Sequence, residues 1–570
     1  MVKVNINGIS VTAPEGATIL DAAKIIHINI PTLCYMNMSD GESINCKGTC
    51  RVCMVEIEGY KDLKPACSFQ IKEGMNIFTN SEKAVNARKT IIKLLLSNHP
   101  NDCLNCAKNL NCELQKIASF YGIKGVKIKG EEIRRKLDRS TPVIRDEEKC
   151  ILCRRCVTAC SEVQNVNILT PAERGFNSFI STFNEKLLDK SECTYCGQCV
   201  AVCPTGALTE RMDYNNLENY LKDKNKYVAV QIAPSVRIAL CEEFGVTKEV
   251  LTTKKIVTAL RYLGFNKVFD TNFGADLTIM EEAEELIERI KCKENLPMFT
   301  SCCPAWVRLV ETKYTKYTNL LSSCKSPQQM FGAIAKAYLP QKLQIDTENL
   351  IISSVMPCTA KKYEAEREEM KDDVDVVITT RELAKLIRKY SIDILDLDES
   401  EFDSPLGKSS GAGMLFGSSG GVMEAALRTA YEKLSGKPLE KLDFLEIRGL
   451  KGIKEATIKI EDKELKVAAV SSLKNAQKII ESVINGEKTY DFIEVMACPG
   501  GCINGGGQPY IQSDRIKIEK RMKSVHEIDE NTEIRKCHEN PEIKEVYEEY
   551  LGKPNSRVAH EILHTKYGNN

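Results

Sequence analysis

The chain has 570 residues, enough for three or four domains. Its 79 basic side chains balance 79 acidic ones, so composition gives no overall case for binding nucleic acid or an anionic membrane. No apolar run approaches the ~18 residues of a membrane span, and the N-terminus alternates like a strand and does not read as a signal peptide. We therefore expect a cytoplasmic protein with neither a membrane nor a nucleic acid among its partners.

The 25 cysteines are the most informative part of the composition. Disulfide frameworks are typical of small secreted domains, whereas this chain is long and spaces most of its cysteines as metal ligands. Iron–sulfur ligation is therefore expected. Five cysteines fall outside the ligand patterns described below and are expected to be small buried apolar side chains: Cys46, Cys241, Cys292, Cys324 and Cys537.

Residues 1–80 read as a small mixed domain, with a helix near 17–26 and a strand over 52–57. Four cysteines frame it: Cys34, Cys50, Cys53 and Cys67. The turn with the middle two resembles the 2Fe-2S β-grasp domain shared by iron-only (FeFe) hydrogenases and respiratory complex I subunits, which implies a 2Fe-2S cluster here. Cys46 is a rival ligand, but its spacing to the next cysteine does not match the C-x4-C-x2-C of plant-type ferredoxins.

Residues 81–123 are predicted to begin with an amphipathic helix over 85–96. One histidine and three cysteines follow: His99, Cys103, Cys106 and Cys112. On spacing alone, these side chains suit a zinc site with three thiolates and one imidazole. The segment also resembles the 4Fe-4S centre with one histidine ligand found in the same two families, and that resemblance implies a 4Fe-4S cluster.

A basic stretch follows, with seven basic side chains in sixteen residues: Lys124, Lys127, Lys129, Arg134, Arg135, Lys136 and Arg139. Such a run is usually a solvated linker. The alternative is a docking face for an acidic electron carrier such as ferredoxin, in which case charge would steer association.

Residues 140–210 contain the most specific pattern in the chain, two C-x2-C-x2-C-x3-C runs in tandem. In two-cluster ferredoxin modules the fourth cysteine of each run binds the cluster of the other run. The spacing therefore predicts two 4Fe-4S clusters, one on Cys150, Cys153, Cys156 and Cys203, and the other on Cys193, Cys196, Cys199 and Cys160.

Residues 211–570 shift to an α/β composition after a polar linker at 213–226. Strand-like and helix-like segments alternate, which predicts an α/β catalytic domain of mostly parallel sheets flanked by helices and ending in a helical tail. Glycine-rich stretches such as 505–507 lack the strand–loop–helix context of a phosphate-binding loop. We interpret them as positions where the backbone passes close to a bound cluster.

Three motifs in this domain follow strand-length apolar runs: TSCCPAW at 300–306, VMPCTAKK at 355–362 and EVMACPGGC at 494–502. Ligands of open α/β sheets bind beyond the carboxyl ends of the strands, so we expect the thiols to converge. Four are enough for an iron–sulfur or zinc site: Cys303, Cys358, Cys498 and Cys502. Because successive side chains on a strand point to opposite faces, Cys302 is expected to face other surroundings than its neighbour.

These motifs resemble the three signature motifs of the iron-only (FeFe) hydrogenases, monomeric clostridial type, and the resemblance covers essentially the whole chain. It implies an enzyme that reversibly reduces protons to H2 with electrons from ferredoxin or flavodoxin. It also implies an H-cluster, in which a 4Fe-4S cluster on the four thiols is bridged by Cys502 to a two-iron subsite with CO, cyanide and dithiolate ligands. Maturation proteins would assemble that subsite. One 2Fe-2S and three 4Fe-4S accessory clusters would carry its electrons.

The resemblance also assigns a proton path, whose matching positions are Cys302, Glu282, Ser322, Glu285 and Arg289. From the residues alone, the charged row at 282, 285 and 289 would be a solvated helix face. The positions that match the surroundings of the two-iron subsite are Pro234, Ser235, Gln328, Met356, Lys361 and Met496. Of these, the ammonium of the lysine would donate to a cyanide ligand.

Other functions share part of this pattern. An electron-transfer subunit of complex I type would share residues 1–210 but lack the three motifs. A hydrogenase-like iron–sulfur assembly protein would lack Cys302 and the complete accessory set, and an H2-sensing homologue would carry an added signalling domain. His560 and His564 match the HExxH pattern of zinc proteases, but no room remains for downstream ligands, so a protease is not expected.

Overall fold

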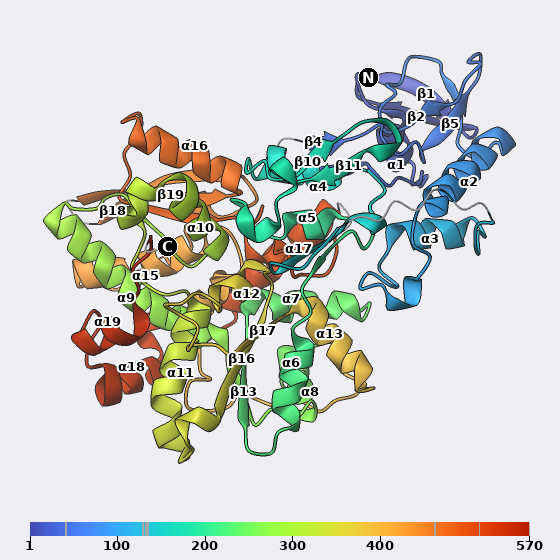
Figure 1. Ribbon diagram of the computed structural model, residues 1–570. Coiled ribbons are helices and arrows are strands. Elements are labelled where there is room, and N and C mark those ends of the chain that lie inside the picture. The colour runs from blue at the N-terminus through green and yellow to red at the C-terminus, as the bar shows by residue number, and fades with distance from the viewer. Residues whose placement is uncertain are drawn as a thin grey trace.

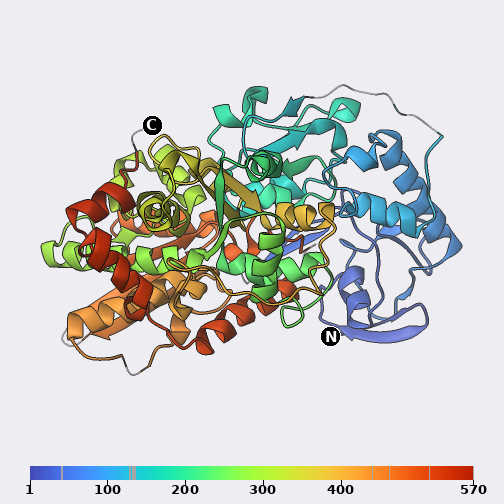
Figure 2. The same cartoon turned by 90° about the horizontal axis from the view of Figure 1, so that it is seen from below.

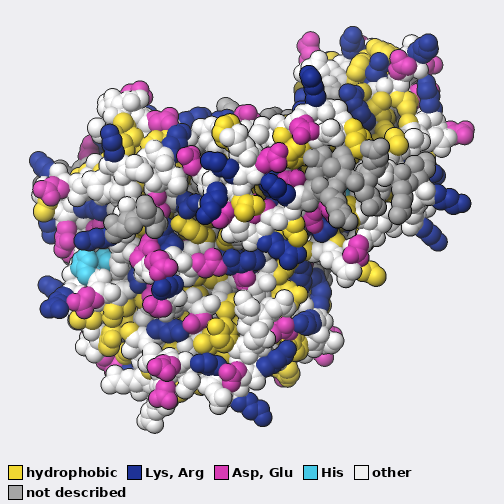
Figure 3. All heavy atoms as spheres, in the orientation of Figure 1, with side chains coloured by type: hydrophobic (Ala, Val, Ile, Leu, Met, Phe, Trp, Pro, Cys, Tyr) yellow, Lys and Arg dark blue, Asp and Glu magenta, His cyan; other side chains and the backbone are white. Residues whose placement is uncertain are grey.

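The computed structural model describes residues 1–568 except 40–42, 128–129, 131–135, 440, 461–462 and 512–513. A small N-terminal lobe is followed by a middle region and a larger body (Figure 1). The N-terminus lies in the lobe and the C-terminus on the body (Figure 2). Basic and acidic side chains are interspersed over the face in Figure 3. Among the described residues, no helix is both long and apolar enough to cross a membrane.

The lobe is built on a five-stranded sheet with the order β2-β1-β7-β5-β6. Its elements are β1 (Val2–Ile6), β2 (Ile9–Ala13), α1 (Ile19–Ile25), β3 (Met36–Ser39), β4 (Ser43–Cys46), β5 (Met54–Ile57), β6 (Lys64–Pro65) and β7 (Asn76–Phe78). Helix α1 begins at a capping box, in which Thr18 and Asp21 each accept a hydrogen bond from the other's backbone. The helix and strand predicted for this region are confirmed, each with shorter bounds.

The middle region holds two helices and then a three-stranded sheet with the order β12-β9-β8. Its elements are α2 (Glu82–Ser97), α3 (Glu113–Phe120), β8 (Leu137–Asp138), β9 (Val143–Asp146), α4 (Arg155–Thr158), β10 (Thr170–Ala172), β11 (Phe179–Ser181), α5 (Gln198–Val202) and β12 (Leu208–Glu210). The buried Arg88 of α2 donates to the carbonyl of Met54 at 2.7 Å. This bond fixes the first helix against β5 of the lobe.

The large body contains two four-stranded sheets, with the orders β14-β13-β16-β17 and β15-β20-β19-β18. Their strands are β13 (Tyr227–Ile232), β14 (Lys267–Asp270), β15 (Met298–Phe299), β16 (Leu350–Met356), β17 (Val376–Thr379), β18 (Ile453–Ile460), β19 (Lys463–Ser471) and β20 (Phe492–Met496). Every pairing is parallel except that of β18 with β19. The predicted class of mostly parallel sheets with flanking helices is confirmed.

The helices of the body include α6 (Tyr214–Lys222), α7 (Pro234–Glu243), α8 (Thr253–Tyr262), α9 (Thr271–Cys292), α10 (Pro304–Lys313), α11 (Pro327–Leu343), α12 (Ala360–Glu364), α13 (Thr380–Lys389), α14 (Gly411–Leu415), α15 (Gly421–Ser435) and α16 (Leu473–Ile484). Helix α6 corrects a prediction, because the segment 213–226, which was expected to be a polar linker, is mostly helix. Leu217 is fully buried in the core, and Glu218 accepts hydrogen bonds from Lys389 and Tyr390 at the end of α13.

The second sheet is covered on both faces, as alternation along β20 shows. Ile493 and Val495 pack with Trp306 of α10 and with α16, whereas Phe492 and Met496 pack with α9 and α15 on the opposite face. Strands buried on both faces are the reason for the continuous apolar runs that preceded each motif.

The C-terminal tail returns to the body as α17 (Arg515–Glu530), α18 (Pro541–Val546) and α19 (Arg557–Leu563). Its last residues pair with the loop before α11: Lys325 donates its backbone N–H to Leu563 at 2.9 Å, and Thr565 donates to Ser323 at 2.8 Å. The tail thus fixes the loop that carries Ser322.

Candidate functional site

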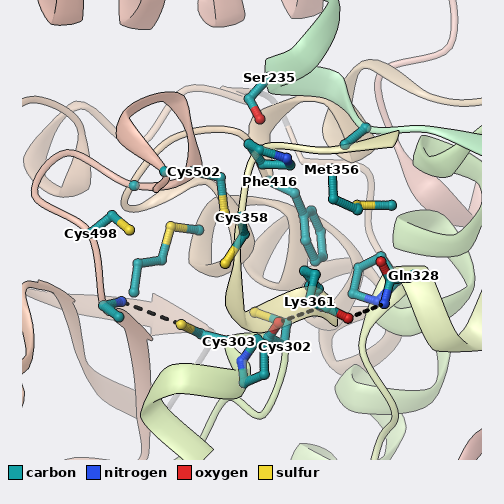
Figure 4. A pocket seen from close by; sticks show the side chains of 18 of the residues that line it. Ser235, Cys302, Cys303, Gln328, Met356, Cys358, Lys361, Phe416, Cys498 and Cys502 are labelled. Atoms are coloured by element: carbon teal, nitrogen blue, oxygen red, sulfur yellow. Dashed lines mark hydrogen bonds between the residues drawn. The ribbon is translucent and has the colours of Figure 1, made fainter. Parts of the chain in front are cut away.

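An apolar cavity lies where the three motifs meet (Figure 4). Cys303 follows β15, Cys358 follows β16, and Cys498 and Cys502 follow β20; all four line the cavity. The strands belong to both sheets of the body. The thiols therefore converge as expected, but between two sheets and not in the crevice of a single one.

The four thiols crowd one side of the cavity, while Gln328, Met356 and Phe416 lie on the other (Figure 4). Burial, and then the nearby Cys303, raise the pKa of Cys358 to about 12. Metal-free thiols would stay protonated here. Iron binding requires thiolates and compensates their burial, so this donor set fits a cluster better than it fits an empty core.

Glycines let the backbone close over the thiols. Gly501 has φ +101°, and a Cβ there would lie 3.0 Å from the sulfur of Met496. At Gly505 a Cβ would lie 2.3 Å from the carbonyl oxygen of Pro357. The backbone passes close to other protein segments at these positions, whereas close approach to a bound cluster stays a prediction.

Cys302 and Cys303 face different surroundings, as the alternation predicted. Cys303 accepts a hydrogen bond from the N–H of Ala497 at 3.4 Å and packs with the apolar side chains on the α10 face of the second sheet. Cys302 packs with the apolar side chains on the α9 face of that sheet. That places its thiol toward the helix that carries Glu282.

Glu282, Glu285 and Arg289, three residues of the expected proton path, lie on α9, and Ser322 lies beside them. Ser322 donates to Glu285 at 2.8 Å, and Arg289 donates to the same carboxylate at 2.6 Å. Glu282 is buried, and neither of its carboxylate oxygens has a hydrogen-bond partner among the described residues. Burial, and then the charge of Glu285, raise the pKa of Glu282 to about 8. A carboxyl group in this state can accept and release protons near neutral pH.

Lys361 is held by a carboxylate that the sequence reasoning missed. Its ammonium lies 2.8 Å from Glu364 and donates to the carbonyl of Cys302 at 3.1 Å. Glu364 also accepts from Ser326 and Gln328 at 2.9 and 3.2 Å. The i,i+3 spacing of the lysine and glutamate on α12 was the available signal.

Comparison with known proteins decides the family. The model for the iron only hydrogenase large subunit, C-terminal domain, matches residues 226–506, and the iron hydrogenase small subunit model matches 514–570. The chain is 48% identical to the NADP-reducing hydrogenase subunit HndD of Solidesulfovibrio fructosivorans, over 100% of this chain and 99% of that one. It is 42% identical to iron hydrogenase 1 of Clostridium pasteurianum over 100% of both. The chain belongs to the iron-only hydrogenases.

Structural comparison agrees. A solved apo [FeFe]-hydrogenase HydA1 of Chlamydomonas reinhardtii superposes with a TM-score of 0.56 at 42% identity, covering 63% of this chain and 99% of that one. The assembly-type alternative is more distant: Protein NAR1 of Arabidopsis thaliana is 32% identical over 66% of this chain. The hydrogenase is accordingly an oxidoreductase that acts on H2, as predicted.

The N-terminal regions match iron–sulfur domains. A 2Fe-2S iron-sulfur cluster binding domain matches residues 1–82, an NADH-ubiquinone oxidoreductase-G iron-sulfur binding region matches 88–127, and an NADH-quinone oxidoreductase subunit 3 ferredoxin-like domain matches 141–209. These descriptions favour iron–sulfur clusters over zinc in all three regions of the hydrogenase.

The tandem array of the hydrogenase folds around two cavities of about 480 Å³ each. One is lined by Cys150, Cys153, Cys156 and Cys203, and the other by Cys160, Cys193, Cys196 and Cys199. Each cavity thus takes its fourth cysteine from the other run, as the spacing predicted. Cys196 also lines the large cavity of the body.

The four cysteines of the lobe are also brought together. In the lobe, Cys34 is in side-chain contact with Cys50 and Cys67, and Cys53 is in contact with Cys67. The side chain of the rival Cys46 lies outside the described residues. Near α3, burial lowers the pKa of His99 to about 4, and its Nδ1 has no partner among the described residues. A neutral, unpartnered imidazole is the form that binds metal.

Several expectations outside the site have clear outcomes. Cys241, Cys324 and Cys537 are buried as predicted, but the prediction is wrong for Cys292, which is exposed because it is the last residue of α9. In the HExxH segment, His564 is bound to Glu281 at 3.0 Å and to Ser323 at 2.8 Å. Of the basic stretch, 128–129 and 131–135 lie outside the described residues.

We expect Glu282 to give a protonated-carboxyl infrared band that disappears as the pH rises through about 8, because its pKa is raised and the acid form persists below that value. Infrared difference spectroscopy of the wild type and of Glu282→Gln measures it. The variant should lack the band, and Glu285→Gln should keep it. A band that is lost well below pH 7, or one that survives in Glu282→Gln, would contradict this assignment.

Proposed function

We propose that Cys303, Cys358, Cys498 and Cys502 hold the 4Fe-4S part of an H-cluster, with Cys502 bridging to a two-iron subsite that carries CO, cyanide and dithiolate ligands. The observation that carries this proposal is the convergence of four buried thiols in one apolar cavity, beside a cysteine of the neighbouring cluster cavity. Such a cluster would supply the redox chemistry that side chains cannot supply. The reaction is the reversible reduction of two protons by two electrons to H2.

The residues on the far side of the cavity would surround the two-iron subsite. Lys361 places an ammonium 2.8 Å from Glu364 at the cavity wall, where it would donate to an anionic ligand such as cyanide. Ser235 has a buried hydroxyl without a partner among the described residues, which offers a second donor. Met356, Met496 and Pro234 would exclude water and leave the site largely apolar.

Protons would travel between Arg289 at the surface end and Cys302 at the cavity. Glu285, Ser322 and Glu282 would be the intermediate positions, because the first two are hydrogen-bonded and the third is buried without a fixed partner. Between Glu282 and Cys302, a proton would pass from the carboxyl group to the thiol.

Electrons would reach the cavity through the cluster that includes Cys196. Gly506 of the body abuts this position, since a Cβ there would lie 2.7 Å from Gly197 and 2.9 Å from the carbonyl oxygen of Cys196. The cluster of Cys203, the His99 centre and the 2Fe-2S cluster of the lobe would feed it. We place this soluble electron chain in the cytoplasm.

The electron carrier would be ferredoxin or flavodoxin. The exposed Lys124 and Lys127, and Leu104 and Leu110 beside the His99 centre, are consistent with docking of an acidic redox protein. The similarity to HndD favours a second candidate, a role as one subunit of an NADP-reducing enzyme. H2 evolution by the isolated chain with reduced ferredoxin, but not with NADPH, would separate the two.

Expression with the hydrogenase maturation proteins should yield about twenty irons per chain and H2 activity, and expression without them about eighteen irons and no activity, because the two-iron subsite is the part that ordinary cluster assembly does not supply. Iron analysis and H2 evolution measure this. Full activity after reconstitution with ordinary clusters alone would refute the H-cluster.

Replacement of the proposed proton donor should separate chemistry from ligation. Cys302→Ser should retain the iron content and slow H2 turnover by at least about a hundredfold, because a hydroxyl group is a far weaker acid than a thiol. Cys302→Asp should recover part of the rate. The matched control is Cys292→Ser, at the exposed cysteine that ends α9. This variant should keep the turnover of the wild type. Normal turnover in Cys302→Ser, or loss of iron, would refute the role.

A further inference from the structure

Lys108 is a buried lysine that the proposed reaction does not use. It lies in the turn between Cys106 and Cys112 and is 2% exposed. Within the described residues it forms no salt bridge, and its ammonium lies 3.0 Å from the centre of the Tyr510 ring, a cation–π contact. The guanidinium of Arg381 lies 4.3 Å from the centre of the same ring. The ammonium is therefore held in one place between the middle region and the body.

Two ligand sets flank this position. On one side is the His99 centre, to which the Lys108 turn belongs. On the other is the loop after Cys203, where a Cβ on Gly206 would lie 2.6 Å from the sulfur of Cys106 and 3.7 Å from the Cβ of Lys108. Glu113 also donates its N–H to the carbonyl of Pro204 at 2.8 Å. The two loops are thus in direct contact, with the lysine beside their junction.

Two other basic side chains near these centres pair with carboxylates. Arg155 pairs with Glu113 at 2.7 Å, and Lys149 pairs with Asp146 at 2.7 Å. A buried ammonium without such a partner is costly. The aromatic ring compensates part of that cost, and the negative charges of Cys203, Glu210 and Glu113 also favour the charged form of the lysine.

We propose that Lys108 is a positioning residue for charge, whose ammonium raises the reduction potentials of the two flanking centres, most strongly the one that includes Cys203. A fixed cation stabilises the reduced, more negative cluster over the oxidised one. Its effect is large because burial keeps water from screening it. The pair of centres is thereby kept reducible by a carrier that delivers electrons beside the His99 centre. This inference rests on the proposed ligand sets.

Redox titration of the intact, fully loaded protein, followed by electron paramagnetic resonance, tests the inference. Lys108→Met and Lys108→Gln should make reduction of the Cys203 centre at least tenfold less favourable, which is 59 mV for one electron. Lys108→Arg should retain a potential near that of the wild type. Lys116→Met, at an exposed lysine on the adjacent α3, is the control and should shift neither centre.

Unchanged potentials in both neutral variants, with the iron content of the wild type, would overturn the inference. Equal shifts in Lys116→Met would overturn it too, because they would reflect general surface charge. Loss of both centres in Lys108→Met and Lys108→Gln would assign the lysine to cluster assembly instead of tuning. Because H2 turnover at the cavity is not the readout, failure here leaves the proposed function standing.

Discussion

The structure depends on four buried thiols that are brought to one point by loops from two different sheets. Burial, with the neighbouring thiols, raises the pKa of Cys358 to about 12, so protonated thiols are what the empty fold would hold. Ligation to iron would replace four protons by one compact centre and tie β15, β16 and β20 together across the body. The glycines of this loop let its backbone pack against neighbouring segments: a Cβ at Gly505 would lie 2.3 Å from the carbonyl oxygen of Pro357, and one at Gly506 would lie 2.7 Å from Gly197.

The second constraint is the short contact between the middle region and the body. Gly197 and Gly506 approach so closely that neither position tolerates a larger residue without a shift. Gln198 adds a buried hydrogen bond to the carbonyl of Asn504 at 3.1 Å, and Gln164 donates to Ala497 at 2.9 Å. These bonds fix the cavity that includes Cys196 against the large one. Electron transfer between clusters held in the two cavities would therefore need no domain motion.

Sequence reasoning was strongest where ligand spacing is dictated by chemistry. The two fourfold sets of the tandem array, the strand β16 and the convergence of the three motifs were all predictable, because a cluster accepts few spacings and a doubly covered strand must be apolar throughout. It was weaker where the partner of a residue is distant in sequence. The helix α6, the bond between Glu281 and His564, and the exposure of Cys292 depend on which surface packs against them, and local pattern does not encode that. The way in which two sheets fit around one site could likewise not be predicted from the sequence.

The most direct test of the central claim is infrared spectroscopy of the maturated protein and of a Cys498→Ala variant, with Cys196→Ala as the matched control in the neighbouring cluster. CO and cyanide stretching bands report the two-iron subsite. The account predicts these bands in the wild type and in Cys196→Ala, and their absence in Cys498→Ala, since only the last removes one of the four thiols proposed to hold the H-cluster. Intact bands in Cys498→Ala, or wild-type turnover without any bands, would contradict it.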